Sequence, residues 1–233
     1  MRHRRWALVA ALVVTAPIMV AAARAKPVQF ADARLIVEVN ATDGDAGLQI
    51  FVDAEPWKQV TVARPDGQQI VDFRTAGPVD GYGLTELFSE SSEPPFTEFP
   101  LERFKELFPP GVYSFAGTTI DGKPLTGNAT LSHAIPNGPT ILAPADGGRV
   151  AADAAVVRWE SGAQPAGVNI VGYQVVVTRE NPQRVLSVDL PASVRSLTIP
   201  REFLESRTGY PLEVLAIDAS GNQTLTQTAF SVR

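Results

Sequence analysis

The feature that most constrains the fold is a run near the C-terminus in which alternate residues are tyrosine or aliphatic. The run comprises Tyr210, Leu212, Val214 and Ala216. A period of two is typical of a β-strand that buries one face. The chain also contains 18 glycines and 19 prolines, with only short segments between them. This pattern predicts an all-β protein built from many short strands.

The C-terminal half, residues 139–233, shows seven such short segments separated by turns. Trp159 and Tyr173 each lie in an alternating run of their own, upstream of the Tyr210 strand. Together these residues resemble the core of a fibronectin type III or immunoglobulin-like domain. The resemblance implies a seven-stranded β-sandwich, in a family whose members mostly bind other proteins or space the catalytic domains of secreted enzymes. The integrin-binding tripeptide of some members does not occur here.

The corner before Tyr210 departs from the family pattern. The family usually places a proline only a few residues before this tyrosine, whereas here nine residues separate Pro200 from Tyr210. The spacing predicts a short helical turn at this corner, with Phe203 and Leu204 turned inward.

The N-terminal half repeats the same order of segments. A strand that ends in an arginine and a turn occurs around Arg64 and again around Arg179. A proline and a helical segment precede Tyr113, as they precede Tyr210. We therefore predict two tandem Ig-like or fibronectin type III-like sandwiches, each with a short helical corner. The alternative is convergence of two unrelated halves on one pattern.

The predicted boundaries follow from the prolines between the halves. Pro136 and Pro139 interrupt any continuous strand and predict a short, stiff linker. The N-terminal domain then spans residues 26–135 and the C-terminal domain residues 139–233, each of ordinary domain size.

The segment 77–99 is predicted to be a loop inserted into the first domain. It contains several glutamates and four aromatic residues, of which Tyr82, Phe88 and Phe96 are the candidates for contact with a partner. Long loops in compact domains are often functional, and aromatic residues are favoured at the centres of interfaces. These three residues are therefore the candidate partner-binding anchors. The alternative is that they fold back onto the first domain and cap its core.

Residues 1–25 have the features of a secretory signal peptide: three arginines, a long apolar run, and a small residue on either side of Arg24. The alternative is an uncleaved membrane anchor. The absence of cysteine favours a bacterial periplasmic or extracellular protein over a eukaryotic secreted one.

After cleavage near Ala25, 16 basic and 25 acidic residues remain, a net charge of −9. Such a charge argues against nucleic acid or an anionic membrane surface as a partner.

Few residue types for catalysis or metal binding are present. The mature chain has His133 alone and no cysteine, which argues against a catalytic triad or a zinc site. No cofactor is expected apart from Ca²⁺, for which Asn40, Asp43 and Asp45 are candidate oxygen ligands. The alternative for these three residues is an ordinary turn.

The sequence thus favours an exported, non-enzymatic binding or structural module of the bacterial cell envelope, with a protein or a glycan as partner. The alternative is an accessory domain or hydrolase acting on extracellular polysaccharide through carboxylates of segment 77–99. A pair of carboxylates with a strongly raised pKa in a cleft favours that alternative, and a flat acidic surface counts against it.

Overall fold

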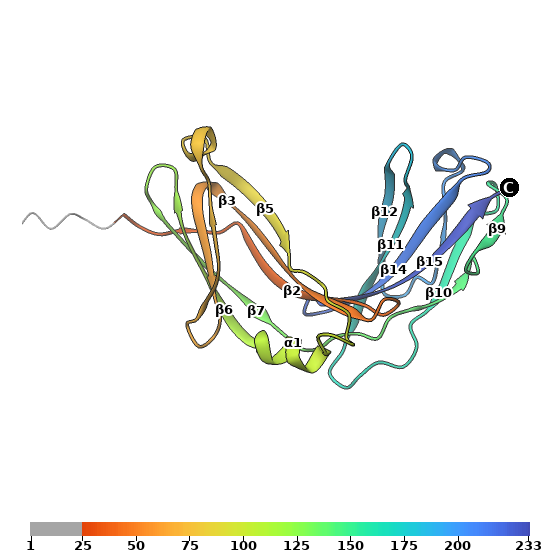
Figure 1. Cartoon of the computed structure of the whole chain (residues 1–233), viewed down its shortest axis with the longest axis horizontal. Helices are drawn as coiled ribbons and strands as arrows, with labels where there is room; N and C mark the ends of the chain where they lie inside the picture. The colour runs from red at the N-terminus through yellow and green to blue at the C-terminus, as the bar shows by residue number, and fades with distance from the viewer. Residues whose placement is uncertain (1–24) are drawn as a thin grey trace, which may run out of the picture.

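The computed structural model describes residues 25–233, and the predicted signal peptide lies outside them apart from Ala25. Two β-sandwiches form the arms of a V (Figure 1). Each arm has its own cluster of buried apolar side chains, one drawn from residues 35–131 and the other from residues 155–232. The predicted all-β class and the two tandem sandwiches are confirmed. Among the described residues, no helix has the length and apolar character needed to cross a membrane.

The C-terminal domain is a three-stranded sheet packed on a four-stranded sheet, with a short strand added at one edge. The smaller sheet has the order β13-β10-β8 and the larger the order β15-β14-β11-β12. This is a fibronectin type III-like sandwich. Its elements are β8 (Thr140–Ala143), β9 (Gly148–Val150), β10 (Val156–Glu160), β11 (Ile170–Arg179), β12 (Arg184–Pro191), β13 (Ser196–Thr198), η2 (Arg201–Phe203), β14 (Gly209–Asp218) and β15 (Gln223–Val232).

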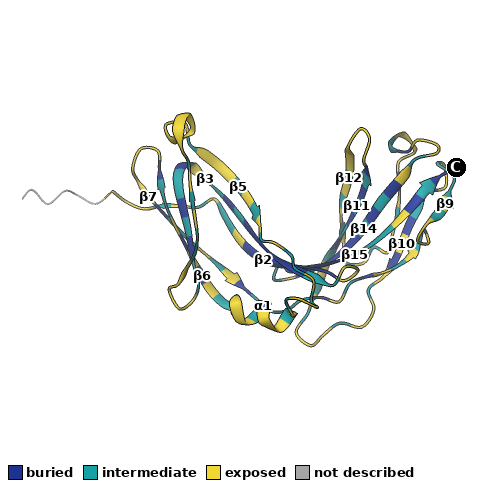
Figure 2. Ribbon diagram, in the orientation of Figure 1, coloured by how far each residue is buried: buried dark blue, intermediate teal, exposed yellow. Residues whose placement is uncertain are grey.

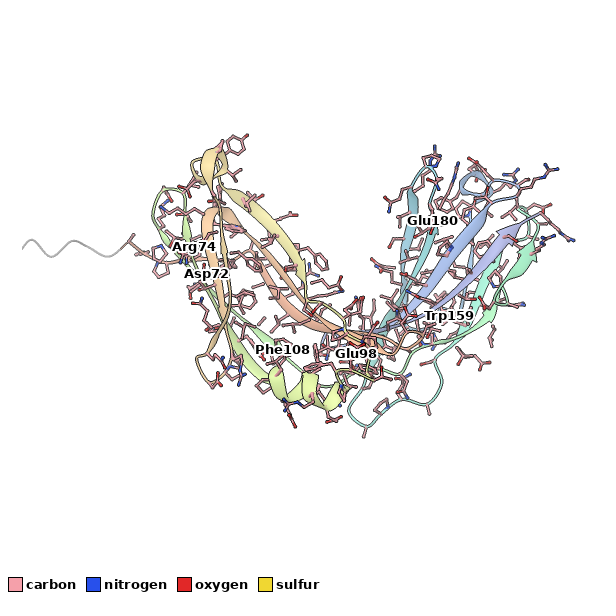
Figure 3. All side chains as sticks on the ribbon, in the orientation of Figure 1. Asp72, Arg74, Glu98, Phe108, Trp159 and Glu180 are labelled. Atoms are coloured by element: carbon pink, nitrogen blue, oxygen red, sulfur yellow. The ribbon has the colours of Figure 1, made fainter. Side chains whose placement is uncertain are left out.

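The aromatic residues that carried the prediction form the core of this domain. Trp159, Tyr173 and Tyr210 are all fully buried, and Figure 3 places Trp159 within the C-terminal arm. The rings of Trp159 and Tyr173 lie 5.6 Å apart, and Tyr210 stacks on Phe230 at 5.4 Å. Contacts of this kind stabilise a core beyond the area they bury.

The N-terminal domain has the same strand order, but one long strand belongs to both of its sheets. The first half of β3 pairs with β2 and β5, and its second half pairs with β4 and β6. Trp57 lies fully buried just after the change of sheet. The elements are β1 (Val28–Gln29), β2 (Asp32–Asn40), β3 (Asp45–Ala63), β4 (Gln69–Arg74), η1 (Gly77–Asp80), β5 (Leu84–Glu90), α1 (Leu101–Leu107), β6 (Gly111–Thr119) and β7 (Pro124–Leu131).

The strand β3 therefore occupies the place of both β10 and β11 in the other domain.

The prediction that residues 77–99 form an inserted loop is wrong. The segment contains β5, which pairs with β3 over Gln49–Asp53 as β13 pairs with β10. The sequence of β5 does not alternate clearly between apolar and polar residues. The reason is that β5 is an edge strand whose residues are mostly exposed (Figure 2).

The two corners share a tyrosine that bonds to the backbone upstream of it. The Tyr113 hydroxyl donates to the carbonyl of Pro109 at 2.9 Å, and the Tyr210 hydroxyl accepts the N–H of Glu205 at 2.7 Å. Such tyrosine corners are a hallmark of this class of sandwich. The predicted helical corners are α1 and η2.

Each corner is also held by the arginine that ends the strand of the predicted repeat. Arg64 donates to the Leu107 carbonyl at 3.2 Å, and Arg179 pairs with the Glu205 carboxylate. The same arginine-to-corner contact in both halves supports the prediction that the second half repeats the first.

Candidate binding face between the domains

The sheets on the inside of the V join edge to edge. Strand β2 of the first domain pairs in parallel with β15 of the second, at Gln223 to Leu225. A continuous sheet with the order β5-β3-β2-β15-β14-β11-β12 therefore lines the inside of the V (Figure 1). We call the side of this sheet that faces away from both cores the inner face.

Buried hydrogen bonds hold this junction. The Asn222 side chain accepts the N–H of Val37 at 2.8 Å and donates to the carbonyls of Ser132 and Ala134 at 2.8 and 3.2 Å. The Thr224 hydroxyl donates to the carbonyl of Pro136 in the linker at 2.6 Å. Because Asn222 and Thr224 are almost fully buried, losing these bonds is costly, and the two arms are held at a defined angle.

A hollow of about 300 Å³ lies in the inner face where the domains meet. The Phe88 ring beside it is 57% exposed. The Arg34 guanidinium stacks 4.3 Å above the Phe51 ring and pairs with Asp32 at 2.9 Å. An apolar floor with a few polar groups around it is typical of a binding site. The hollow is lined by Arg34, Ile36, Gln49, Phe51, Phe88, Gln174, Ile217, Gly221 and Gln223.

Three carboxylates lie close together beside the hollow. Two of them are on the inner face, and the third, Glu93, comes from the segment after β5 and lies over Gly47. Oxygens of Glu38, Glu90 and Glu93 lie within 4.8 Å of one another. Gln49 donates to Glu90 at 2.7 Å, and Gln223 donates to Glu38. The two glutamines thus link the carboxylates of the first domain to β15 of the second.

Gly47 makes room for this cluster. A side chain at position 47 would meet Glu93, because an ideal Cβ there lies 2.6 Å from the Glu93 Oε1. Burial, and then the carboxylates of Glu90, Asp45 and Glu38, raises the pKa of Glu93 to about 7. Burial also raises the pKa of Glu38, with Glu90 and Glu213 contributing in the same direction.

The inner face as a whole is acidic. Over the seven strands of this sheet, the pairing registers place eight carboxylates on this side and Arg34 as the single basic side chain. The eight are Asp32, Glu38, Asp45, Asp53, Glu86, Glu90, Asp189 and Glu213. The added strand β9 carries a second basic residue, Arg149, beside Ser231 near the end of β15.

The three predicted aromatic anchors do not share a surface. Phe88 lies on the inner face opposite Phe51. Tyr82 is 84% exposed but lies in the turn after η1, at the other end of β5. Phe96 is half-buried against the first core, and its N–H bonds to the carbonyl of Gly44 at 2.7 Å. The alternative that all three are buried core residues is wrong for Tyr82 and Phe88.

The predicted calcium ligands form a turn between β2 and β3. The Asn40 side chain accepts the N–H groups of Thr42 and Asp43 and donates to the Asp43 carboxylate at 2.9 Å. The Asn40 amide oxygen therefore already accepts two hydrogen bonds within the turn. Asp45 extends toward Glu93, and burial and the Asp43 carboxylate raise its pKa. Calcium binding by these residues stays a prediction.

His133 lies away from the inner-face hollow. Its Nε2 is 2.8 Å from the carbonyl oxygen of Phe108, so the ring holds the helical corner to the last residues of the first domain.

Sequence reasoning missed Glu38, Gln49 and Gln223, which lie together on the inner face where the domains meet. Each is the outward residue of an alternating strand, and such residues are ordinarily solvated. At the Gln223–Glu38 contact, the pairing of β2 with β15 joins residues that are 185 positions apart in the sequence. No local sequence pattern predicts a pairing over this distance.

Comparison with known proteins gives structural similarity only. No protein-family model and no curated protein matches the sequence. A two-domain fibronectin type III segment of chicken tenascin aligns over 87% of this chain and 98% of its own, at 13% identity and a TM-score of 0.31.

Structures of two adhesion proteins align over similar shares of this chain. A 1.5-MDa bacterial ice-binding adhesin aligns over 88% of this chain and 65% of its own, at 15% identity and a TM-score of 0.30. A tetra-tandem repeat from the extending region of a large adhesion protein aligns over 87% and 50%, at 14% identity and 0.31. The fold class itself rests on the strand order of the two sandwiches.

Proposed function

We propose that this chain is an exported, non-enzymatic binding module of the bacterial cell envelope, and that its inner face contacts a protein or glycan partner. One observation carries the proposal. Two sandwiches share one continuous sheet, and the hollow at their junction presents an exposed Phe88 among arginine and glutamine side chains. A site built across two domains needs the fixed angle that the buried Asn222 bonds provide. A preformed site loses less entropy on binding than a mobile one.

The remaining expectations belong to the same proposal. The excess of acidic residues argues against nucleic acid and anionic membrane as partners. Export rests on the predicted signal peptide.

Site-specific photo-crosslinking tests the proposal. A photoreactive phenylalanine analogue replaces Phe88 on the inner face, or Val112 on the outer sheet as the matched control. Both side chains are more than half exposed. We expect a discrete crosslinked product in the native cells from position 88 and none from position 112. Equal products from both positions, or none from position 88, would refute the inner face as the contact surface.

One observation favours hydrolysis as a second candidate function. Glu93 has a pKa of about 7 and lies within 4.8 Å of two other carboxylates, the combination expected of an acid and base pair. However, none of the three lines the hollow, and Glu38 and Glu90 are bonded to glutamines. Release of reducing ends from cell-envelope polysaccharide, abolished by Glu93→Gln but not by Glu98→Gln, would establish hydrolysis and displace the binding proposal.

A further inference from the structure

We infer that the inner face binds a basic, extended polypeptide segment of another protein, in which an apolar side chain contacts Phe88 and lysine or arginine side chains flank it. This inference rests on the proposed function and names the partner's chemistry. Three features of the inner face carry it: the position of its charges, their imbalance, and the free edge of β5.

The carboxylates surround the hollow at the spacing of a β-strand. Glu86 and Glu90 lie two residues on either side of Phe88, and Asp53 lies two residues beyond Phe51. On a strand, a step of two residues is about 6.6 Å on one face. An apolar group at Phe88 would therefore have acidic groups on both sides along β5.

The charge imbalance is local. The first domain, residues 26–135, has 16 acidic and 8 basic residues, whereas the second, residues 139–233, has 9 and 8. Near the hollow, the one basic side chain on the described part of the inner face is Arg34, which is already paired with Asp32, and Arg149 on β9 lies beside Ser231 near the end of β15. Complementary charge speeds association and selects a partner of opposite sign, so the inner face selects for a cationic partner.

The edge of β5 favours a polypeptide over a glycan. This strand pairs with β3 on one side, and over the described residues no backbone hydrogen bond is made along its other side. An extended segment can add to such an edge through main-chain hydrogen bonds. Its alternate side chains would then follow the order basic, apolar, basic opposite Glu86, Phe88 and Glu90.

The test uses the purified protein and a synthetic peptide with blocked ends, Thr-Lys-Thr-Val-Thr-Lys-Thr. Two control peptides replace both lysines by glutamate, or the valine by serine. Two-dimensional amide NMR titration locates the contact, and calorimetry gives the affinity at low and high salt. We expect saturable shifts of amides in β5 and β2, weaker binding at high salt, and no binding of the glutamate peptide.

Variants of the protein sharpen the result. Glu86→Gln and Glu90→Gln should each weaken binding by about two- to fivefold, as expected for exposed ion pairs. Phe88→Ser should weaken it by about tenfold. The matched control is Glu202→Gln, an exposed carboxylate on η2, which should leave the affinity unchanged.

The possible failures are distinguishable. Binding of a neutral chitin hexasaccharide at Phe88 without peptide binding would refute this inference and leave the proposed function standing. Calcium saturating Glu38, Glu90 and Glu93 while the peptide leaves the inner face unshifted would also refute it. Equal binding of the glutamate peptide would show that charge does not select the partner. If no crosslinked product formed from position 88 in the photo-crosslinking experiment, the proposed function itself would be refuted.

Discussion

The two domains solve the same topology in different ways. In the C-terminal domain, β10 and β11 are separate strands in opposite sheets, joined by residues 161–169. In the N-terminal domain the single strand β3 takes the positions of both strands, because its first half lies in one sheet and its second half in the other. It changes sheet near Pro56, whose carbonyl accepts the N–H of Ile120. A continuous strand couples the two sheets directly, whereas a loop leaves them joined through the core.

What the domains share is informative in a different way. Both keep the tyrosine corner, the arginine that holds it, and a buried tryptophan. The tryptophans differ in place, because Trp159 lies on β10 and Trp57 lies at the change of sheet in β3. The corner is therefore the common element, and the route between the sheets is what varies.

The largest expected effect compares the two tryptophans. Trp57→Ala and Trp159→Ala should each lower the free energy of unfolding of their own domain by about 3–5 kcal/mol, through lost burial and a cavity. Urea denaturation monitored by circular dichroism measures both. An unmoved midpoint for Trp159→Ala would contradict its core role.

Phenylalanine variants sharpen the same comparison. The indole N–H of Trp57 donates to the Thr85 carbonyl at 3.3 Å, whereas that of Trp159 has no partner among the described residues. Trp159→Phe should therefore cost less than Trp57→Phe, because it removes a buried donor that is already unpaired.

The next effect tests whether the domains act as one unit. Asn222→Ala leaves the Val37 N–H and the Ser132 and Ala134 carbonyls without their partner, which should cost about 2–4 kcal/mol. We expect the urea transitions of the two domains to separate in this variant. Fragments 26–135 and 139–233 should each fold, as the sequence predicts, and dispersed amide spectra would demonstrate it.

Asn137→Ala is the matched control. The Asn137 side chain also bridges the linker to the second domain, by donating to the Ala163 carbonyl at 2.8 Å. Its backbone N–H bonds to Gln164, and alanine keeps that bond. Asn137 is exposed, so water replaces the lost side-chain bond and the loss of stability should be small. If the two variants were equally destabilised, the buried junction would not be what joins the domains.

A smaller effect compares the two corners. Tyr210→Phe leaves the N–H of Glu205 unpaired, whereas Tyr113→Phe leaves only the Pro109 carbonyl. Unpaired buried N–H groups are tolerated less often than carbonyls. We expect losses of about 1–2 kcal/mol for Tyr210→Phe and about 0.5–1 kcal/mol for Tyr113→Phe, measured by thermal unfolding. The reverse order would show that the corners are held by packing alone.

The sequence predicted the fold well because the cores lie in local patterns. Alternation around Trp159, Tyr173 and Tyr210 identified the second sandwich, and the spacing before Tyr113 and Tyr210 identified both corners. The continuous β3 was missed, because Pro56 reads as the end of a strand. It is tolerated at the change of sheet, where the ladder is interrupted.

The candidate site was predicted only in part. The sequence named Phe88 as an aromatic anchor among glutamates, and the structure places it on the surface beside the hollow. Its role in binding stays a prediction. Its partners Phe51, Arg34 and Ile217 come from three other strands. Their meeting depends on the pairing of β2 with β15, which is set by tertiary contacts and has no signature in sequence.

The smallest expected effect is a pH dependence that distinguishes the acidic junction from the rest of the molecule. The pKa of Glu93 is about 7 in the folded protein and 4.5 is its ordinary value. Between these values the folded chain binds more protons than the unfolded chain, so stability falls as pH rises through this window. The raised pKa values of Glu38 and Glu213 act in the same direction. Asp121, whose pKa is lowered to about 2 by Lys123 and Thr119, contributes stability that is lost only at more acidic pH.

Thermal unfolding at pH 5.5 and pH 8 measures this slope. Wild-type Tm should be lower at pH 8, because the carboxylates of the junction are then charged and repel one another. Glu93→Gln should remove most of the difference, chiefly by raising Tm at pH 8. Glu98→Gln is the control from the same segment, at the foot of the V (Figure 3), and is exposed. A Tm that rises from pH 5.5 to pH 8, or a slope that Glu93→Gln leaves unchanged, would show that the carboxylate cluster does not govern the stability of the junction.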